Sequence, residues 1–202
     1  MAEFERIENS NKACLAAGVN TITSFIQGSA ESIFCAEWYE EIVEAELSLY
    51  KWRFATKTAD LGAVLAAVPD TKYNTAYQIP NDVMSVDTVL VGETSIAYDR
   101  FQDQIHTFDT ANDTVIIKYR YRCDETLWNP YFRLLVIYRL ATMLSFSIAR
   151  KDDIAASMKQ LADDHWRRAK TEDAQAQTNQ KVNLSKIVRA RGGSLDKFWR
   201  RR

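Results

Sequence analysis

The two histidines of this chain are among the residues best suited to metal or acid–base chemistry. His165 follows Asp163 and Asp164, and carboxylate and imidazole groups are common metal ligands. Consecutive side chains on a helix point about 100° apart, so these three need partners from elsewhere to hold one ion. His106 lies in the run DQIHTFD, which predicts a strand or hairpin surface. We therefore expect structural roles for both histidines, with metal binding at His165 as the weaker alternative.

The acids and thiols of the chain do not form a recognisable reactive motif. The aspartates that surround one predicted turn lack the spacing and the glycine of an EF-hand loop: Asp99, Asp103, Asp109 and Asp113. The cysteines are far apart and form no CxxC pair, which predicts neither a disulfide framework nor a zinc site: Cys14, Cys35 and Cys123. The motifs GxGxxG, GxSxG, HExxH and the P-loop are also absent. We expect no catalytic, metal or cofactor-binding residues, although a site assembled from distant residues would leave no such motif.

The most unusual composition lies in residues 181–202, KVNLSKIVRARGGSLDKFWRRR, which we call the basic arm. It holds eight Lys or Arg and one acid, Asp196, a net charge of +7. The other 180 residues hold 18 basic and 26 acidic side chains, a net charge of −8, so the −1 of the whole chain conceals two segments of opposite sign. The sequence therefore predicts an acidic body that carries a cationic arm.

The basic arm fits two kinds of partner. Its positive charges could neutralise phosphates in a sequence-independent, salt-dependent contact with DNA. Alternatively it docks on protein, with apolar side chains in pockets and arginines on carboxylates, and fully extended it reaches at most about 70 Å. The aromatic pair beside the last arginines favours protein docking. The candidate docking residues are Lys186, Arg189, Arg191, Lys197, Phe198, Trp199, Arg200, Arg201 and Arg202.

Apolar periodicity predicts the elements that must position these groups. Spacings of three and four predict helices over 4–17, 30–51, 130–149 and 153–180, with Ser29 as a cap and Pro130 in a first turn. The predicted apolar face of the first helix includes Leu15, and that of the second includes Ile33 and Trp38. The run 131–149 is apolar enough to suggest a membrane span, but its two arginines make insertion costly, so we expect a buried helix and no membrane.

Residues 53–125 change to a period of two, which predicts a β-rich module of about five strands or fewer. The turn TANDT at 110–114 predicts a hairpin. In the strand that follows, alternate residues from Val115 to Tyr121 are apolar or aromatic, and Lys118, Arg120 and Arg122 face the other side, which predicts one buried face and one solvated basic face.

These elements together predict an α+β protein. A four-helix bundle-like domain comprises 1–52 and 126–180, a small antiparallel β module is inserted at 53–125, and 181–202 extends as a C-terminal arm.

Several local patterns, in this order, resemble the tail tubular protein A family of short-tailed bacteriophages. They are Ser10-Asn11-Lys12-Ala13-Cys14-Leu15 with Gly18, Leu49-Tyr50-Lys51-Trp52-Arg53-Phe54-Ala55, Tyr77-Gln78-Ile79-Pro80-Asn81-Asp82, and Val115 to Tyr121 followed by Trp128-Asn129-Pro130-Tyr131-Phe132 and Leu140-Ala141. They cover residues 10 to about 165, which leaves the basic arm outside the resemblance.

The resemblance implies a structural virion protein rather than an enzyme. Members of the family form a head-to-tail adaptor, a homo-oligomeric ring of about twelve subunits between the portal protein and the tail nozzle protein, around the channel for packaged DNA. The implied location is the neck of the virion, after assembly in the host cytoplasm. Docking of the basic arm on the portal is our expectation, and non-sequence-specific DNA binding by the same arm is the alternative.

Overall fold

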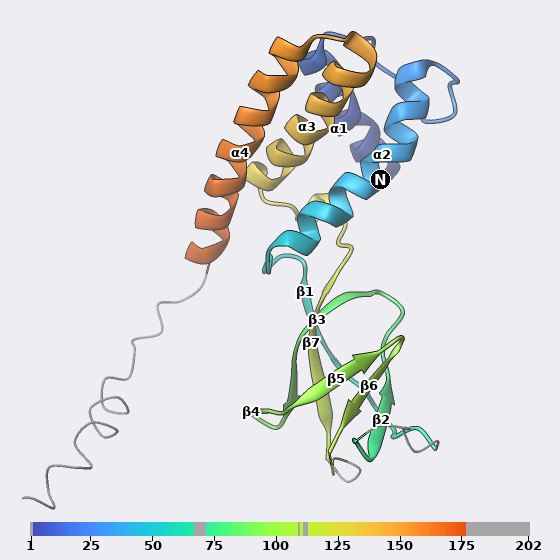
Figure 1. Cartoon of the computed structure of the whole chain (residues 1–202), viewed down its shortest axis with the longest axis vertical. Coiled ribbons are helices and arrows are strands. Elements are labelled where there is room, and N and C mark those ends of the chain that lie inside the picture. The colour runs from blue at the N-terminus through green and yellow to red at the C-terminus, as the bar shows by residue number, and fades with distance from the viewer. Residues whose placement is uncertain (1, 67–71, 109, 111–112, 177–202) are drawn as a thin grey trace, which may run out of the picture.

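The computed structural model describes residues 2–66, 72–108, 110 and 113–176. This part of the chain contains four α-helices and two antiparallel sheets, which confirms the predicted α+β class. The helices lie at one end of the molecule and the strands at the other, and the chain crosses between the two ends at residues 50–55 and again at 122–129 (Figure 1).

Local capping signals fix where two of the four described helices start. The helices are α1 (Ala2–Ala17), α2 (Ala30–Leu49), α3 (Pro130–Leu144) and α4 (Asp152–Gln175). The side chain of Ser29 accepts a hydrogen bond from Ser32 N at 3.2 Å, so Ser29 caps α2 as predicted. Asn129 accepts from Phe132 N at 2.7 Å at the start of α3, where Pro130 occupies the first turn. The last residues of the predicted helix 153–180 lie outside the described residues.

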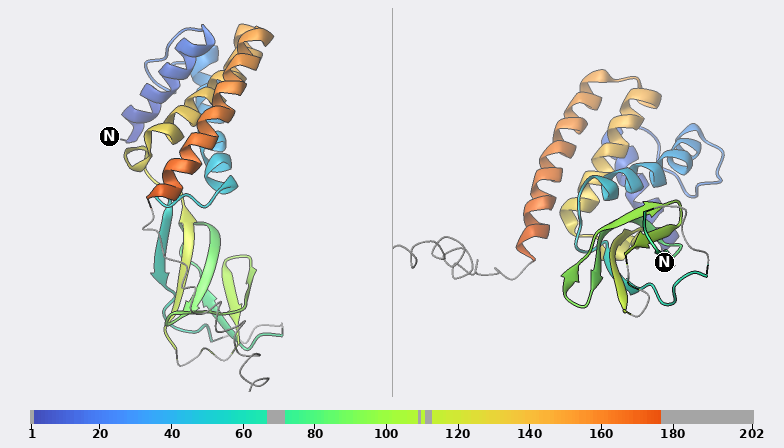
Figure 2. Two further views of the ribbon diagram at one scale, coloured as in Figure 1. Left: turned by 90° about the vertical axis from the view of Figure 1, so that its left-hand side faces the viewer. Right: turned by 60° about the horizontal axis from the view of Figure 1, so that its bottom comes forward.

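The helix α3 is central to the helical end. It contacts α1, α2 and α4, and Figure 2 shows it between α1 and α4. Its side chains Phe132, Leu135, Leu140 and Leu144 are buried. It continues into a π-helical segment, η2 (Ser145–Ala149). Together α3 and η2 form the one described helix long and apolar enough to cross a membrane, but much of its apolar surface packs against the other helices.

On α1 and α2, the predicted apolar face is wider than the strip of helix surface that neighbouring elements bury. Leu15 of α1 is 68% exposed, and Ile33 and Trp38 of α2 are 55% and 44% exposed. Spacing shows where apolar residues gather on a helix, but not how wide a strip its neighbours bury. These three side chains lie on the predicted apolar faces, but neighbouring elements leave them exposed.

The strands form two sheets rather than a single module of five strands or fewer. One sheet has the order β1 (Thr56–Asp60), β7 (Val115–Tyr121), β3 (Val83–Val91), β4 (Thr94–Ser95), and the other has the order β2 (Thr75–Gln78), β6 (Gln104–Thr107), β5 (Tyr98–Phe101). The sheets share a core in which Tyr77 and Ile105 of one sheet join Val89, Ile117 and Tyr119 of the other. The seven described strands exceed the predicted number because two- to four-residue strands leave almost no periodic signal.

The hairpin predicted at 110–114 is wrong. The strand before it, β6, pairs with β2 and β5, whereas the strand after it, β7, pairs with β1 and β3. The connection therefore passes from one sheet to the other. The hydroxyl of Tyr77 donates to Thr110 O at 2.7 Å and holds the start of this connection. Turn-forming residues mark a change of direction, but they do not determine which strand pairs with which.

The strand β7 has the predicted alternation but not a fully free basic face. Val115, Ile117 and Tyr119 are buried, as predicted. On the other side, Arg120 Nε lies 3.3 Å from Asp87 Oδ1, and its Nη1 donates to Ser48 O at 2.5 Å. The prediction of a solvated basic face must be corrected for Arg120 and Arg122, because carboxylate and carbonyl partners partly bury both guanidiniums.

Candidate functional site at the junction of helices and sheets

The side chains best suited to metal or acid–base chemistry are held in structural contacts. His165 on α4 lies beside the rings of Tyr131 and Tyr138, at 6.0 and 5.2 Å between ring centroids, and burial lowers its pKa. Asp163 pairs with Arg139 at 3.0 Å and Asp164 with Arg167 at 3.3 Å. No group of three or more His, Cys, Asp or Glu within the described ranges could hold a metal ion. His165 and Asp163 thus contact α3, and Asp164 pairs with a residue of its own helix.

The other chemically competent residues are also separate from one another. His106 is buried in β6, so the prediction of a surface position is wrong, and it packs on Phe101, with 4.8 Å between ring centroids. All three cysteines are buried as free thiols, and burial raises the pKa of Cys123 to about 11. The Cys123 thiol is therefore a poor nucleophile near neutral pH, because the thiolate is the reactive form. Of the four turn acids, Asp109 lies outside the described residues, and Asp99 pairs with Lys72 at 3.5 Å.

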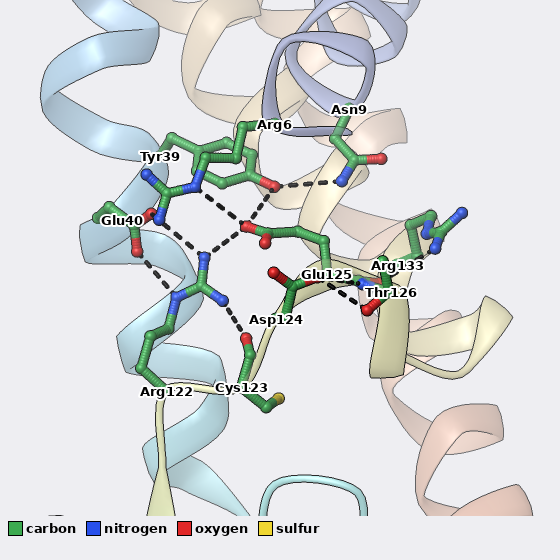
Figure 3. A network of polar contacts seen from close by, with 10 residues as sticks. All are labelled: Arg6, Asn9, Tyr39, Glu40, Arg122, Cys123, Asp124, Glu125, Thr126 and Arg133. Carbon is green, nitrogen blue, oxygen red and sulfur yellow. Dashed lines mark hydrogen bonds and ion pairs between the residues drawn. The ribbon is translucent and has the colours of Figure 1, made fainter. Parts of the chain in front are cut away.

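A polar network joins the helices at the point where β7 leaves the sheet (Figure 3). Arg122 follows β7 directly, and Glu125 begins the short 3-10 helix η1 (Glu125–Leu127). Arg122 contacts Glu125 Oε1 through Nη2 at 2.5 Å and Glu40 Oε2 through Nε at 2.9 Å. From α1, Arg6 also pairs with Glu40, and its Nε lies 3.4 Å from Glu125 Oε1. Two carboxylates and two guanidiniums therefore balance one another's charge.

Burial makes this network important for the fold. Glu125 is only 1% exposed, so these partners take the place of water around its carboxylate. Burial opposes the charge on Arg122, but the hydrogen bonds that its guanidinium donates to Glu40 and Glu125 outweigh burial and raise the pKa of Arg122 above its usual value. Burial also raises the pKa of Tyr39. Its hydroxyl accepts a hydrogen bond from Asn9 Nδ2 at 3.1 Å and donates one to Glu125 Oε1 at 3.5 Å. We call Arg6, Asn9, Tyr39, Glu40, Arg122 and Glu125 the junction network.

The other chain crossing, from α2 to β1, is held by a second set of contacts. Trp52 is buried, its Nε1 donates to Glu46 O at 2.8 Å, and its ring packs 4.9 Å from that of Phe132. The backbone N–H of Arg53 donates to both oxygens of Asp173 on α4, at 3.0 and 3.2 Å. Both crossings are thus tied to the helices, and the helical end and the sheets are joined by two fixed connections instead of flexible linkers.

Sequence reasoning missed the acids at these crossings, although two of them carried a signal. Glu46 lies seven residues after the buried Tyr39, and Asp173 lies four residues after the buried Ala169, so both occupy the buried stripes of their helices. An acid on such a stripe predicts a buried partner. Glu125 lies in a three-residue 3-10 helix with no periodicity, so no comparable signal existed for it.

Glu46 is a buried carboxylate that pairs with one basic side chain. It is 5% exposed, its Oε1 accepts from Arg139 Nε at 2.8 Å, and its Oε2 has no hydrogen-bond partner among the described residues. Burial raises the pKa of Glu46, although the charge of Arg139 opposes the shift. Ionisation of Glu46 therefore costs more in the folded protein than in the unfolded chain.

This raised pKa predicts how Glu46→Gln changes the pH dependence of stability. Because the folded pKa lies above the unfolded value of about 4.5, stability from this group is present at lower pH and is lost as pH rises through the folded pKa. The variant lacks that loss. The difference between its thermal midpoint and that of the natural protein should therefore become more positive as the pH rises from about 4 to about 7. Thermal unfolding at several pH values measures this. A constant or falling difference would contradict the assignment, and Glu44→Gln on the exposed side of α2 is the control.

A cleft of about 450 Å³ opens beside the same crossing. We call it the basic cleft, and it is lined by Tyr50, Lys51, Arg53, Thr56, Lys57, Thr58 and Lys118. Four of these seven residues are basic, and they come from the α2–β1 connection, from β1 and from β7.

The docking residues predicted on the basic arm, Lys186 to Arg202, lie outside the described residues, so their role stays a prediction. No protein-family model matches this chain, and no curated protein sequence matches it. The resemblance to the tail tubular protein A family therefore also stays a prediction.

Proposed function

We propose that this protein is a structural virion protein, a head-to-tail adaptor that forms a ring between a portal and a tail nozzle around the channel for DNA. In this proposal the four helices form a bundle-like domain, the two sheets form an inserted module, and residues 181–202 form an arm that docks on the portal. The observation that carries the proposal is the division into a helical end and a sheet end whose two crossings are both held by buried contacts. Such a subunit can connect different partners at its two ends and transmit force between them.

Exposed apolar side chains supply candidate contacts between subunits. A ring requires that one face of each subunit bind a different face of the next, and aromatic residues are common anchors of such interfaces. The helices expose large apolar side chains at Phe4, Leu15, Ile33, Trp38, Leu49 and Leu161. Scattered exposed apolar residues are normal on any protein, so these positions support the proposal only together with the two-ended architecture.

The acidic body suits a channel for DNA. Residues 1–180 carry a net charge of −8, and a ring multiplies this charge around its axis. Acidic groups that face the channel would repel the polyanion and let it slide instead of binding it. The same charge makes the body a poor DNA-binding surface, which leaves the basic arm as the candidate for the alternative function.

Removal of the basic arm separates portal docking from DNA binding. A protein that ends at Lys181 should bind purified portal at least about tenfold more weakly, because each arm contributes to a multivalent contact. Phe198→Ala combined with Trp199→Ala in the full chain tests the proposed anchors without changing the charge. Surface-bound portal and a titration of each protein measure the affinity.

Two outcomes would contradict portal docking by the arm. The first is an undiminished affinity of the shortened protein for portal. The second is loss of DNA retention in a gel shift while portal binding stays intact, which would favour the DNA-binding function instead. An unchanged affinity of the Phe198→Ala, Trp199→Ala protein, with weaker binding of the shortened one, would assign docking to charge alone.

A further inference from the structure

The basic cleft lies beside a strand edge with which no other described strand pairs. In the order β1-β7-β3-β4, the strand β1 is at the end of its sheet, and Figure 2 shows it at the outer side of the strands. Thr56 and Thr58 of this strand line the cleft, together with the α2–β1 connection. An edge strand presents backbone groups that can pair with an added strand.

The register of β1 shows which backbone groups face the open edge. Tyr121 N donates to Ala55 O at 3.1 Å, and Leu61 N donates to Val115 O at 2.9 Å, so the residues paired with β7 are the odd-numbered ones. In an antiparallel pair every second residue directs its N–H and C=O away from the partner strand. Thr56, Thr58 and Asp60 therefore face outward. Thr56 N already donates to Arg53 O at 3.1 Å, which leaves Thr58 at the centre of the open edge.

The ion pairs that the described residues form around the cleft involve Lys51 and Lys57 but not Lys118. Lys51 pairs with Asp87 at 3.2 Å, and Lys57 pairs with Asp82 at 3.1 Å. Lys118, directly opposite Thr58 in the register, has no ion-pair partner among the described residues. The neighbouring Arg120 shares Asp87 with Lys51, so the basic side chains here outnumber these acids. Asp60 is the acid at the far end of the strand.

We propose that the basic cleft and the open edge of β1 together bind an extended acidic peptide segment of another protein by strand addition. The backbone of the peptide pairs with Thr58, and a carboxylate of the peptide reaches Lys118. Backbone pairing supplies affinity and the side-chain pocket supplies selectivity, as in other cases of strand addition. This inference does not depend on the adaptor role, because it uses only the cleft, the strand register and the local charges.

The observations favour a peptide over a nucleic acid as the occupant. Phosphate contacts need several uncompensated cations, and two of the cleft's four basic residues already pair with aspartates. The acidic body would also repel a DNA duplex at long range. A short acidic strand carries few charges, and unlike DNA it can satisfy the backbone groups of Thr58.

Binding of a labelled peptide of alternating Thr and Glu to the full chain tests the proposal, with fluorescence anisotropy as the measurement. Lys118→Glu should weaken binding by about tenfold or more, because it removes a charge-assisted hydrogen bond and adds repulsion. Thr58→Pro should weaken it similarly, because proline removes the outward N–H and leaves the ladder to β7 intact. Two matched controls should change little: Thr58→Ala, which keeps the N–H, and Lys159→Glu, which makes the same charge change on α4.

Each variant is first compared with the natural protein by circular dichroism, and Lys118→Gln replaces Lys118→Glu if the latter unfolds. No binding of the peptide by the natural protein would overturn the proposal. Equal weakening by Lys159→Glu would show a general charge effect, and full binding by Thr58→Pro would exclude strand addition. The natural protein could instead bind pyrophosphate or a short DNA duplex more tightly than the peptide. If Lys118→Glu abolished that binding and Thr58→Pro did not, the cleft would be a phosphate site.

Discussion

Replacing Glu125 with Ala should lower the free energy of unfolding by about 3–5 kcal/mol, because one partner of a buried charge network is removed. The substitution leaves Arg122 without one carboxylate and leaves the buried Tyr39 hydroxyl without its acceptor. It also loosens the connection from β7 to α3, which passes through Glu125. Urea unfolding followed by circular dichroism measures the change.

The control for this prediction is Glu44→Ala, which removes an exposed carboxylate from the same helix as Glu40 and should change stability by less than about 0.5 kcal/mol. Arg122→Ala combined with Glu125→Ala should cost less than the sum of the two single substitutions, because the two side chains share one interaction. A loss below about 1 kcal/mol for Glu125→Ala would show that water or rearranged partners replace the carboxylate, and that the network does not hold the junction.

Replacing Trp52 with Ala should cost about 3–5 kcal/mol, the usual range for deletion of a large buried aromatic side chain. The ring lies within 5.7 Å, centroid to centroid, of Tyr50, Phe54 and Phe132, so its loss opens a cavity where α2, β1 and α3 meet. Unfolding is followed by circular dichroism, since the substitution also removes a fluorophore.

Trp52→Phe separates the two contributions of this side chain. It keeps an aromatic ring in the cluster but loses the hydrogen bond from Nε1 to Glu46 O, so it should cost less than Trp52→Ala by at least about 1 kcal/mol. Equal costs for the two variants would mean that the hydrogen bond, and not the packing, holds the α2–β1 crossing.

The parts of the fold that could be predicted from the sequence depend on local interactions. Ser29 and Asn129 cap helices through hydrogen bonds that span three residues, and such patterns can be read from a single chain. The division of β7 into a buried and a partly solvated face follows from its alternation, which is also local. These features need no knowledge of what packs against them.

The errors concern contacts between distant residues. The pairing of β6 with β2, and of β7 with β1 and β3, joins residues 24 to 64 positions apart, and turn residues carry no information on it. Arg120 was expected to be solvated because nothing near it in sequence shows that Asp87 lies beside it. Trp38 lies on the predicted apolar face of α2 but is exposed, because a helix stripe does not reveal how far its neighbours extend.

The candidate site was less predictable than the fold. The basic arm was identified from composition alone, and its residues lie outside the described part of the chain. The junction network brings together residues from α1, α2 and η1 that are up to 119 positions apart, Arg6 and Glu125 being the extremes. Only the acids on helix stripes, Glu46 and Asp173, gave a sign in the sequence that a buried polar contact was present.

The central claim is that this protein assembles into a ring at a portal, and electron microscopy of the protein with and without purified portal tests it most directly. The account predicts closed rings stacked on the portal, with a central channel and the sheets on the side away from it. Native mass spectrometry of the same samples gives the number of subunits. A protein that remains monomeric under every condition, portal included, would contradict the account.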